Sequence, residues 1–398
     1  MIRRTRRTAL SDVLGLERNL VAVSVAMFLL ALGEQLWKRF LPKYLEALGA
    51  PIRAIGLFGT CENVVDGLYQ YPGGWIADRY GRRHALLLFV TLATIGYVVY
   101  WAAPAWPFVF VGLVLAMAWS SMASPTLFAV VGDSLPPERR AVGFTVQSIL
   151  RRIPIVVAPT LGGMAIVAYG VRGGVHLGLV LTIGLALITL FVVSRVAIPV
   201  APDHAPINVM SVWRSMPEPL RWLLASDVCI RTCDGLVDIF LVLYAINIVG
   251  LDAPQYGALV AVQMLTAILS YLPSAPLADR IGRKPFVIAT FIAFTLFPLA
   301  VVMSGSFLAL CGAFVVGGLR EIGEPARKAL IVDLAVPRVR ARTIGLYYLI
   351  RSLCIAPAAY IGGLLWEASP RWPFYVAGMI GAAGVVMFVV TVDEAGAG

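Results

Sequence analysis

The chain has 398 residues, of which 60% are hydrophobic and only 14% are charged, and its formal net charge is +10. A soluble protein of this length needs more charged residues to cover its surface, so the composition excludes a soluble globular protein and indicates a bilayer protein. Because roughly 20 apolar residues cross the hydrocarbon core as a helix, the sequence predicts twelve transmembrane helices with short connections. In chain order they span residues 20–44, 53–76, 84–103, 106–132, 140–168, 174–197, 220–249, 255–277, 285–304, 307–333, 341–367 and 372–391.

The second half of the chain repeats the first at an offset of about 200 residues. The run Ala77–Arg83 (Ala-Asp-Arg-Tyr-Gly-Arg-Arg) recurs as Ala278–Lys284, and turn-forming residues such as Pro125 and Pro325 keep the spacing. A duplicated bundle with its site at the repeat interface is typical of secondary transporters. We therefore expect an all-α polytopic membrane protein of two pseudo-symmetric six-helix bundles. Their predicted bounds are 1–197 and 220–398, and a proline-rich cytoplasmic linker spans 198–219.

Lysine and arginine residues outside the predicted helices lie mostly on one side of the membrane. With residues at the ends of the predicted spans counted among the turns, nineteen of them are in the leader and the turns of that side, against four on the other. The positive-inside rule therefore places both termini in the cytoplasm. We expect the protein in the plasma membrane, which is the inner membrane in a bacterium. This topology and attraction to anionic headgroups account for the positive net charge, so no nucleic-acid partner is implied.

The turn between the second and third predicted helices carries a specific motif, Gly-x-x-x-Asp-Arg-x-Gly-Arg-Arg, which here is Gly74–Arg83. The twelve predicted helices, their six-plus-six duplication and this motif together resemble the major facilitator superfamily of secondary transporters. Within that family the chain resembles the bacterial proton-coupled exporters of drugs and other solutes. The resemblance covers essentially the whole chain. It implies a monomer that moves a small molecule, in exchange for protons, by rocking its two halves around a midplane site.

In that family the aspartate of this turn caps a neighbouring helix and pairs with basic residues, which latches the cytoplasmic side when the transporter faces outward. An aspartate at a helix N-terminus, a glycine in the tight turn and arginines that reach carboxylates permit this mechanism. The expected gating residues are Asp78, Arg79, Gly81, Arg82 and Arg83, and in the second copy Asp279, Arg280, Gly282, Arg283 and Lys284. The alternative, that these are only positive-inside charges on tight turns, explains the arginines but not the fixed aspartate and glycine.

The fifth predicted helix keeps part of a second family pattern, the Gly/Pro-rich stretch of antiporters. Ala158–Gly163 retains the proline and both final glycines, although Ala158 and Pro154 replace the earlier glycines. Close helix packing explains these residues nearly as well, so they favour antiport without requiring it. The expected helix-packing residues are Pro159, Gly162, Gly163, Gly362 and Gly363.

Charged residues inside the predicted helices need a separate explanation, because each ionised group near mid-bilayer costs roughly 2.5–3.5 kcal/mol. Their helical spacing places each set on one face, as in a helix that lines a polar cavity. The sets are Glu34 and Lys38; Glu62 and Asp66; Asp227, Arg231, Asp234 and Asp238; and Arg320, Glu324 and Arg327. In the family, helices 1, 4, 7 and 10 surround the central cavity, and three of these four carry charge here. The arginine that many exporters have in helix 4 is absent, and its repeat mate is Arg320.

Two roles follow for these charges. Burial favours the neutral form of a carboxyl group and a nearby arginine favours the carboxylate, so alternating exposure can switch protonation. Candidate proton-coupling residues are Glu34, Glu62, Asp66, Asp234 and Asp238, with structural pairing as the alternative. Candidate substrate-binding residues are Arg151, Arg351, Arg320, Glu324, Tyr347 and Tyr348, of which Arg151 and Arg351 are repeat mates suited to an anionic group. Asp227 and Arg231 are expected to form an internal i, i+4 pair, and Arg327 and Lys328 are expected to snorkel toward the cytoplasm.

Three functions are compatible with these residues. The first is a proton-coupled exporter of a small organic solute. The second is a uniporter or importer of an anionic or zwitterionic metabolite, and the third, suggested by methionine and aromatic residues in helices 4 and 10, is an amphiphile or lipid flippase. An enzyme is not expected, because no Ser/His/Asp set, metal cluster or phosphate loop is recognisable, and no metal or cofactor is implied.

Overall fold

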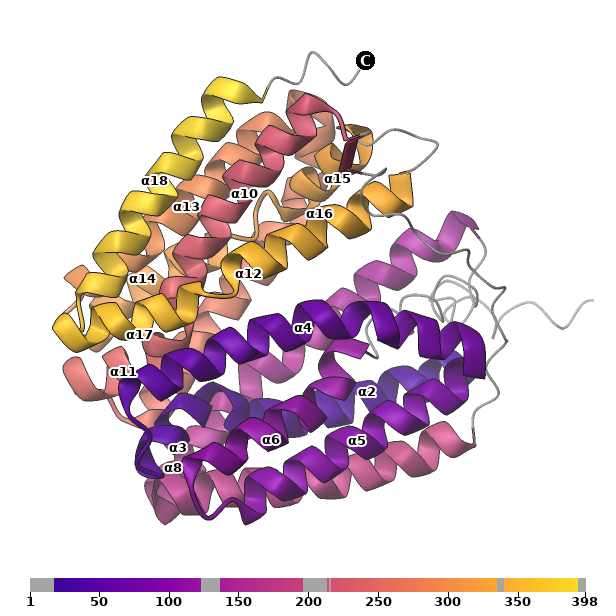
Figure 1. Ribbon diagram of the computed structural model, residues 1–398, viewed down its shortest axis with the longest axis vertical. Coiled ribbons are helices and arrows are strands. Elements are labelled where there is room, and N and C mark those ends of the chain that lie inside the picture. Colours follow the sequence, from indigo (N-terminus) through magenta and orange to yellow (C-terminus); the bar gives the residue numbers. More distant parts are fainter. Residues whose placement is uncertain (1–17, 123–136, 196–212, 215, 335–339, 393–398) are drawn as a thin grey trace, which may run out of the picture.

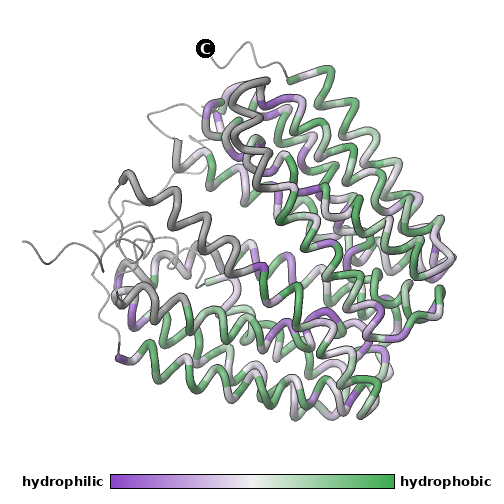
Figure 2. The backbone as a smooth tube through the Cα atoms, turned by 180° about the vertical axis from the view of Figure 1, so that it is seen from behind, coloured by the Kyte–Doolittle hydropathy of each residue, from purple (hydrophilic) through white to green (hydrophobic). Residues whose placement is uncertain are grey.

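The computed structural model describes residues 18–122, 137–195, 213–214, 216–334 and 340–392. Every regular element among these residues is a helix, and the helices form two groups that follow each other in the sequence (Figure 1). Figure 2 shows hydrophobic residues along most of the length of the helices, with hydrophilic residues at helix ends and in the interior. Large apolar side chains on the outer surface are exposed, among them Met303, Leu308 and Val390. Such a surface suits lipid, because apolar side chains gain nothing from facing water.

The first group contains α2 (Arg18–Trp37), the 3₁₀ turn η1 (Lys38–Phe40), α3 (Leu41–Ala47), α4 (Ile52–Tyr80), α5 (Arg82–Ala102), α6 (Trp106–Met117), the π-helical η2 (Ala118–Met122) and α8 (Pro137–Ser194). Within α8 the helical path breaks at Gly170, whose φ of 74° is accessible mainly to glycine. The break falls between the predicted spans 140–168 and 174–197.

The second group begins with α10 (Glu218–Val237), the 3₁₀ turn η3 (Asp238–Phe240), α11 (Leu241–Leu243), the π-helical η4 (Tyr244–Ile248) and α12 (Ala253–Ile281). It continues with α13 (Lys284–Met303), α14 (Phe307–Leu319), α15 (Glu324–Leu334), α16 (Arg340–Ile355), α17 (Ala358–Ala368) and α18 (Trp372–Thr391). A turn at 320–323 separates α14 from α15, so the predicted helix 307–333 is two helices with a break between them.

The duplication read from the sequence is visible in matched elements. Helices α2 and α10 each have 20 residues and are each followed by one 3₁₀ turn, while α4 and α12 each have 29 residues. Gly81 and Gly282, which end α4 and α12, have φ values of 83° and 96°. These positive values explain why both copies of the turn carry glycine at this place. The expected two-bundle repeat therefore has direct structural counterparts.

The described part of the chain has six helical segments that are long and apolar enough to cross a membrane, and shorter apolar helices at 106–122 and 307–319. Helices α2, α4 and α10 are not among the six. These findings support a multi-pass membrane protein. The number of twelve spans stays a prediction.

The two groups of helices meet at one end of the molecule and diverge toward the other (Figure 1). At the first, which we call the closed end, Lys43 contacts Asn247 at 2.5 Å, Arg53 contacts Glu367 at 2.7 Å, and the Tyr360 amide donates to Thr60 at 3.1 Å. The opposite end carries the arginine-rich turns at 79–84 and 282–284, and we call it the basic end.

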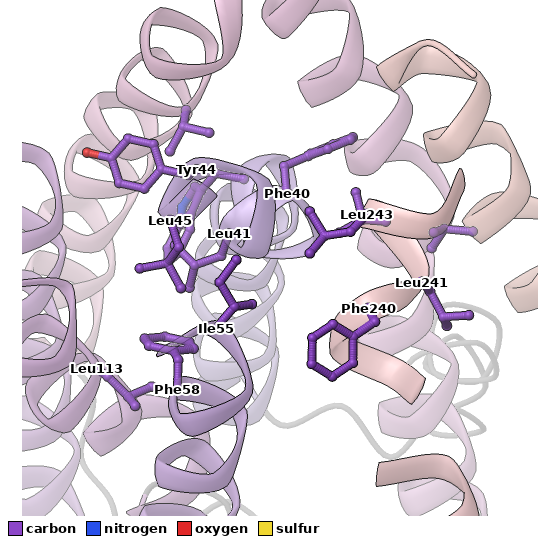
Figure 3. Packing of buried hydrophobic residues seen from close by; sticks show 14 of the residues in the cluster. Phe40, Leu41, Tyr44, Leu45, Ile55, Phe58, Leu113, Phe240, Leu241 and Leu243 are labelled. Atoms are coloured by element: carbon purple, nitrogen blue, oxygen red, sulfur yellow. The ribbon is translucent and has the colours of Figure 1, made fainter. Parts of the chain in front are cut away.

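Buried aromatic and aliphatic residues fix the helix breaks beside the closed end (Figure 3). Phe40 and Phe240, at equivalent positions, are fully buried. The Phe40 ring contacts Tyr256 of the other half edge-on at 5.8 Å, and Phe240 stacks on Trp366 at 5.4 Å. Since each aromatic residue of this size buries a large apolar area, these contacts hold the two 3₁₀ turns in place and thereby position the residues that precede them.

Candidate functional site

A polar cavity of about 380 Å³ lies between the two halves. Seven of its lining residues are charged: Lys38, Glu62, Asp66, Arg231, Asp234, Asp238 and Arg351. The other lining residues are Gly59, Asn63, Met117, Ser120, Gly235, Ile239, Ser352, Ile355 and Ala359, and none of them is aromatic. A smaller cavity of about 220 Å³ adjoins it and shares Lys38, Glu62, Asp238 and Ile239.

The breaks in two helices bring charge to this cavity. α2 ends at Trp37 and α10 ends at Val237, and their backbone angles are nearly the same (φ −123° and −119°, ψ −26° and −27°). Lys38 and Asp238 are the first residues of the 3₁₀ turns that follow, and both line both cavities. A discontinuous helix at the repeat interface therefore presents a cation from one half and an anion from the other.

Among the predicted proton-coupling residues, four line the larger cavity and the fifth lies behind its wall. Glu62 is 3.5 Å from Lys38, and both side chains are about one-third exposed. Asp66 accepts a hydrogen bond of 2.6 Å from Ser121. Glu34 is buried and accepts a 2.5 Å hydrogen bond from the hydroxyl of Tyr97.

Asp234 and Asp238, on the other half, differ in their partners. Asp234 pairs with Arg320, whose guanidinium also lies over the rings of Phe294 and Phe297, at 4.9 and 4.4 Å from their centroids. Asp238 is exposed toward the cavities, and no described residue forms a hydrogen bond or ion pair with its carboxylate. The two carboxylates are therefore held very differently although they lie one turn apart.

The second half also contains a buried charge cluster behind the cavity wall. Asp227, which is fully buried, accepts hydrogen bonds from Arg327 at 2.5 Å, from the Tyr347 hydroxyl at 2.9 Å and from Arg351 at 3.3 Å. A separate carboxylate, Glu324, is 2.7 Å from Arg327. The cluster thus links α10, α15 and α16.

Arg231 completes this cluster from the cavity side. One of its guanidinium nitrogens is 3.1 Å from Glu324, and its Nε is 3.8 Å from Asp227, which is too long for a hydrogen bond. The predicted i, i+4 pair of Asp227 and Arg231 thus exists at ion-pair distance, but the shorter contacts of Asp227 come from Arg327 and Tyr347.

The expectation that Arg327 snorkels to the cytoplasm is wrong. Its side chain is 1% exposed and bridges Asp227 and Glu324. Lys328, by contrast, is 56% exposed and lies 3.6 Å from Glu324. The error has a physical origin in the break between α14 and α15: because the helix does not run continuously, Arg327 turns inward although it is close to the end of the segment.

The predicted substrate-binding residues are divided between the cavity wall and the charged groups behind it. Arg351 lines the cavity, and its guanidinium lies 4.6 Å from the centroid of the Tyr348 ring. Glu324 and Tyr347 belong to the buried cluster, and Arg320 pairs with Asp234 behind the wall. The side chain of Arg151 lies outside the described residues.

Arg152, next to Arg151, connects the two halves instead. Its guanidinium is 2.8 Å from Glu321, which lies in the turn between α14 and α15. From the sequence, adjacent arginines on a helix point about 100° apart, so only one of Arg151 and Arg152 is expected to face the cavity and the other to serve structure. Glu321 is not among the residues that the sequence pattern predicts for the site.

The predicted gating residues near the basic end contact their own halves. Arg83 donates to the carbonyl of Ser194, and Arg283 forms an ion pair with Asp333. The guanidinium of Arg79 lies over the rings of Trp75 and Tyr80. Lys284 begins α13. The side chains of Asp78, Arg82, Asp279 and Arg280 lie outside the described residues.

The predicted helix-packing residues lie at close backbone contacts. A Cβ at Gly162 would collide with the carbonyl of Leu36, and one at Gly163 would lie 2.5 Å from the carbonyl oxygen of Ala253 in the other half. A Cβ at Gly362 would meet the carbonyl of Leu236, whereas at Gly363 the nearest atom, the Ile52 carbonyl oxygen, is 3.3 Å away. Pro159 is buried in α8 beside Gly257. These positions allow neighbouring helices to approach each other closely.

Comparisons with known proteins agree with this architecture. The sequence profile of the Major Facilitator Superfamily matches residues 23–226 and again residues 223–398. An uncharacterized MFS-type transporter of Methanocaldococcus jannaschii is 20% identical over 367 residues, which are 90% of this chain and 91% of that protein. The quinolone resistance protein NorA of Staphylococcus aureus is 27% identical over 146 residues, 36% of this chain and 38% of NorA.

Solved structures share the fold. The crystal structure of a mutant of the nucleoside transporter NupG superposes with a TM-score of 0.79 at 12% identity and covers 94% of this chain and 100% of that one. At this level of identity the likeness concerns the fold alone.

Proposed function

Because the chain belongs to the major facilitator superfamily, we propose that it is a secondary transporter that moves a small polar solute through the cavity between its halves. It is a transporter and not an enzyme, as its family indicates. The proposed topology has twelve spans in two bundles, 1–197 and 220–398, joined by the linker 198–219. Both termini and the basic end lie in the cytoplasm, since the arginine-rich turns follow the positive-inside rule, and the membrane is the plasma membrane.

The observation that carries this proposal is the cavity at the repeat interface, lined by four carboxylates and three cationic side chains. Charged groups at such a depth are costly unless they act on a solute, an ion or each other. Contacts between the halves gather at the closed end, so the conformation described corresponds to a cavity that opens toward the basic end. Alternating access would break the contacts of Lys43, Arg53 and Thr60 and bring the two basic turns together.

We propose that transport is outward and coupled to protons. The likeness to NorA, a protein named for quinolone resistance, favours export of an organic solute. Glu34, Glu62, Asp66, Asp234 and Asp238 are the carboxyl groups that would carry the proton, because each lies in or directly behind the cavity wall and its surroundings change when the halves rock.

Proteoliposomes test this coupling. Purified protein is reconstituted with a pH-sensitive dye inside the vesicles, and candidate solutes are added one at a time. We expect a proton flux that depends on the solute and that is lost in at least one of Glu34→Gln, Glu62→Gln, Asp66→Asn, Asp234→Asn and Asp238→Asn. Glu218→Gln, at the exposed start of α10, is the matched control. Solute transport with unchanged proton flux in all five variants would exclude coupling through these groups.

A uniporter or importer of an anionic or zwitterionic metabolite is the second candidate, and the polar wall of the cavity favours it. Lipophilic solutes are bound mainly by apolar and aromatic side chains. Among the described residues that line the larger cavity, the large apolar ones are Met117, Ile239 and Ile355. Solute uptake at a rate that does not depend on a pH gradient, but that Arg351→Ala abolishes, would support this candidate. The same polar lining does not favour a lipid flippase. A flippase would transport a fluorescent lipid across the membrane of sealed vesicles, and this assay tests that function.

A further inference from the structure

The wall formed by α10 and α16 carries two guanidinium groups that face the cavity. The side chain of Arg351 is 17% exposed and that of Arg231 is 23% exposed, and both residues line the 380 Å³ cavity. The hydrogen bonds that the described residues give them use one nitrogen of each group, Nη1 of Arg351 to Asp227 and Nη2 of Arg231 to Glu324. A guanidinium group offers five donors in a fixed fork that matches an oxyanion, so both side chains retain donor capacity that the protein itself does not use.

The charges of the cluster behind these two arginines do not cancel. Three guanidinium groups, those of Arg231, Arg327 and Arg351, face two carboxylates, those of Asp227 and Glu324. The ammonium of Lys328 adds further positive charge from the exposed side. A buried structural ion pair is stable when its charges are balanced and hydrogen-bonded. Within this cluster one positive charge is therefore in excess, and it lies at the part of the wall that holds Arg351 and Arg231. The carboxylates of Glu62, Asp66, Asp234 and Asp238 line the same cavity, so the excess favours an anionic group at the two arginines and not throughout the cavity.

The contacts of Asp227 show which arginine can leave it. Arg327 and the Tyr347 hydroxyl hold the same carboxylate oxygen at 2.5 and 2.9 Å, whereas Arg351 is 3.3 Å away. If Arg351 moves toward the cavity, Asp227 keeps two short hydrogen bonds and a full counter-charge. If Arg327 moved, a fully buried carboxylate would lose its principal partner. Arg351 is therefore the mobile member of the cluster, and Arg327 is the fixed one.

We propose that Arg351 and Arg231 form an oxyanion subsite of the transport cavity, and that the solute carries a carboxylate, phosphate or sulfonate group that replaces Asp227 as the partner of Arg351. The proposal rests on the proposed role of the cavity as the solute site. Arg231 contributes the second guanidinium while it stays anchored to Glu324. The solute class is thus narrowed to small molecules that bear an oxyanion, either anionic or zwitterionic, since a cationic group on the same molecule would face the carboxylates of the cavity. Solutes without an oxyanion are not expected.

The test measures the unfolding temperature of the full-length protein in nanodiscs with acetate, methanesulfonate or inorganic phosphate, against chloride at equal ionic strength. The three probes distinguish the possible head groups. We expect the unfolding temperature to rise, and to level off at high concentration, with at least one of the three anions. In Arg351→Gln the half-maximal concentration should increase by about tenfold or more, because hydrogen bonds to charged groups contribute on the order of 1.5–3 kcal/mol. Arg351→Lys should keep part of the effect, and Arg53→Gln, at the closed end, should keep all of it.

The same variant separates a ligand subsite from a structural ion pair. Removing Arg351 brings the buried cluster to two guanidinium groups and two carboxylates, so Arg351→Gln without added anion should unfold at the wild-type temperature or above it. A fall as large as that of Arg327→Gln would overturn the proposal, as would an anion effect that persists unchanged in Arg351→Gln.

A second readout does not depend on stability. Ser352→Cys places a thiol on the cavity wall beside Arg351, and the effective anion should slow its alkylation, followed by peptide mass spectrometry. Unprotected alkylation at saturating anion would count against the subsite. Anion binding without transport of any solute would support the oxyanion subsite and contradict the proposed transport function. Transport of uncharged solutes alone would support the transport function and contradict the oxyanion subsite.

Discussion

Lys38 and Asp238 occupy equivalent positions in the two halves and line the same cavity. Each is the first residue of a single 3₁₀ turn that follows a 20-residue helix, and the positions are 200 residues apart. The duplication therefore gives a pair of opposite charges at the centre of the molecule. A cavity built in this way is polar on both sides and can exchange ion-pair partners when the halves move.

Lys38 should matter for transport far more than for stability. Its pair with Glu62 is 3.5 Å long and about one-third exposed, and such pairs contribute about 0–1 kcal/mol. Lys38→Gln should therefore unfold close to the wild-type temperature while solute transport in proteoliposomes falls strongly. Lys38→Arg, which keeps the charge, should retain part of the activity. If Lys38→Gln transports at the wild-type rate, Lys38 is not part of the solute path.

The buried pair of Asp227 and Arg327 should be essential for stability. Removing one partner of a buried ion pair leaves an uncompensated charge and costs about 3–5 kcal/mol. Asp227→Asn and Arg327→Gln should each lower the unfolding temperature markedly, measured in nanodiscs without solute.

The double variant provides the control for this pair. Asp227→Asn with Arg327→Gln should cost clearly less than the sum of the two single changes, because neither charge is left alone. Strict additivity would mean that the two side chains do not interact, contrary to the 2.5 Å contact.

Gly163 should be sensitive to the addition of a single methyl group. A Cβ there would lie 2.5 Å from the carbonyl oxygen of Ala253 in the other half, so the backbones would have to separate. Gly163→Ala should be destabilised by about 1–3 kcal/mol. Gly312→Ala is the matched control, because nothing lies within 4 Å of a Cβ at that position, and it should unfold like the wild type. Equal effects of the two changes would show that inter-half packing is not responsible.

A cross-link between the halves should stop transport. A Cβ at Gly59 would lie 2.9 Å from the Cβ of Ala359, which is shorter than the 3.5–4.5 Å of a disulfide, so a small separation of the two helices brings the pair into bonding range. Gly59→Cys with Ala359→Cys should therefore oxidise readily, and transport should be lost and then recovered on reduction. Each single variant, treated with the same oxidant, is the control. Full transport by the oxidised double variant would mean that the halves need not separate here.

Much of the fold could be predicted from the sequence because the two halves repeat the same apolar spans and turn glycines at a constant spacing. The predicted span 372–391 coincides with α18 (Trp372–Thr391), and the glycines after α4 and α12 mark turns that need positive φ. The helix breaks were harder to predict. The turns at Lys38 and Asp238 contain neither proline nor glycine, and the turn that separates α14 from α15 interrupts an otherwise regular charge pattern.

The site could be predicted in part for a related reason. The spacing on α10 correctly indicated a charged face, and Glu62, Asp66, Asp234, Asp238 and Arg351 all line the cavity. The partners of Asp227 were missed because Arg327 and Tyr347 lie 100 and 120 positions away. A spacing rule on one helix finds only local pairs. The fully buried Tyr347 also shows that proximity to Arg351 in sequence does not place a ring in the cavity.

The central claim is that one cavity is reached in turn from the two sides of the membrane, and thiol labelling tests it without knowledge of the solute. The five native cysteines are replaced with alanine, and Ser120→Cys then places one thiol on the cavity wall. His84→Cys at the basic end and Ser306→Cys at the start of α14 mark the two sides. In sealed vesicles, a membrane-impermeant reagent should reach each marker from one side only and should reach position 120 from both. Labelling of position 120 from a single side under all conditions would contradict alternating access.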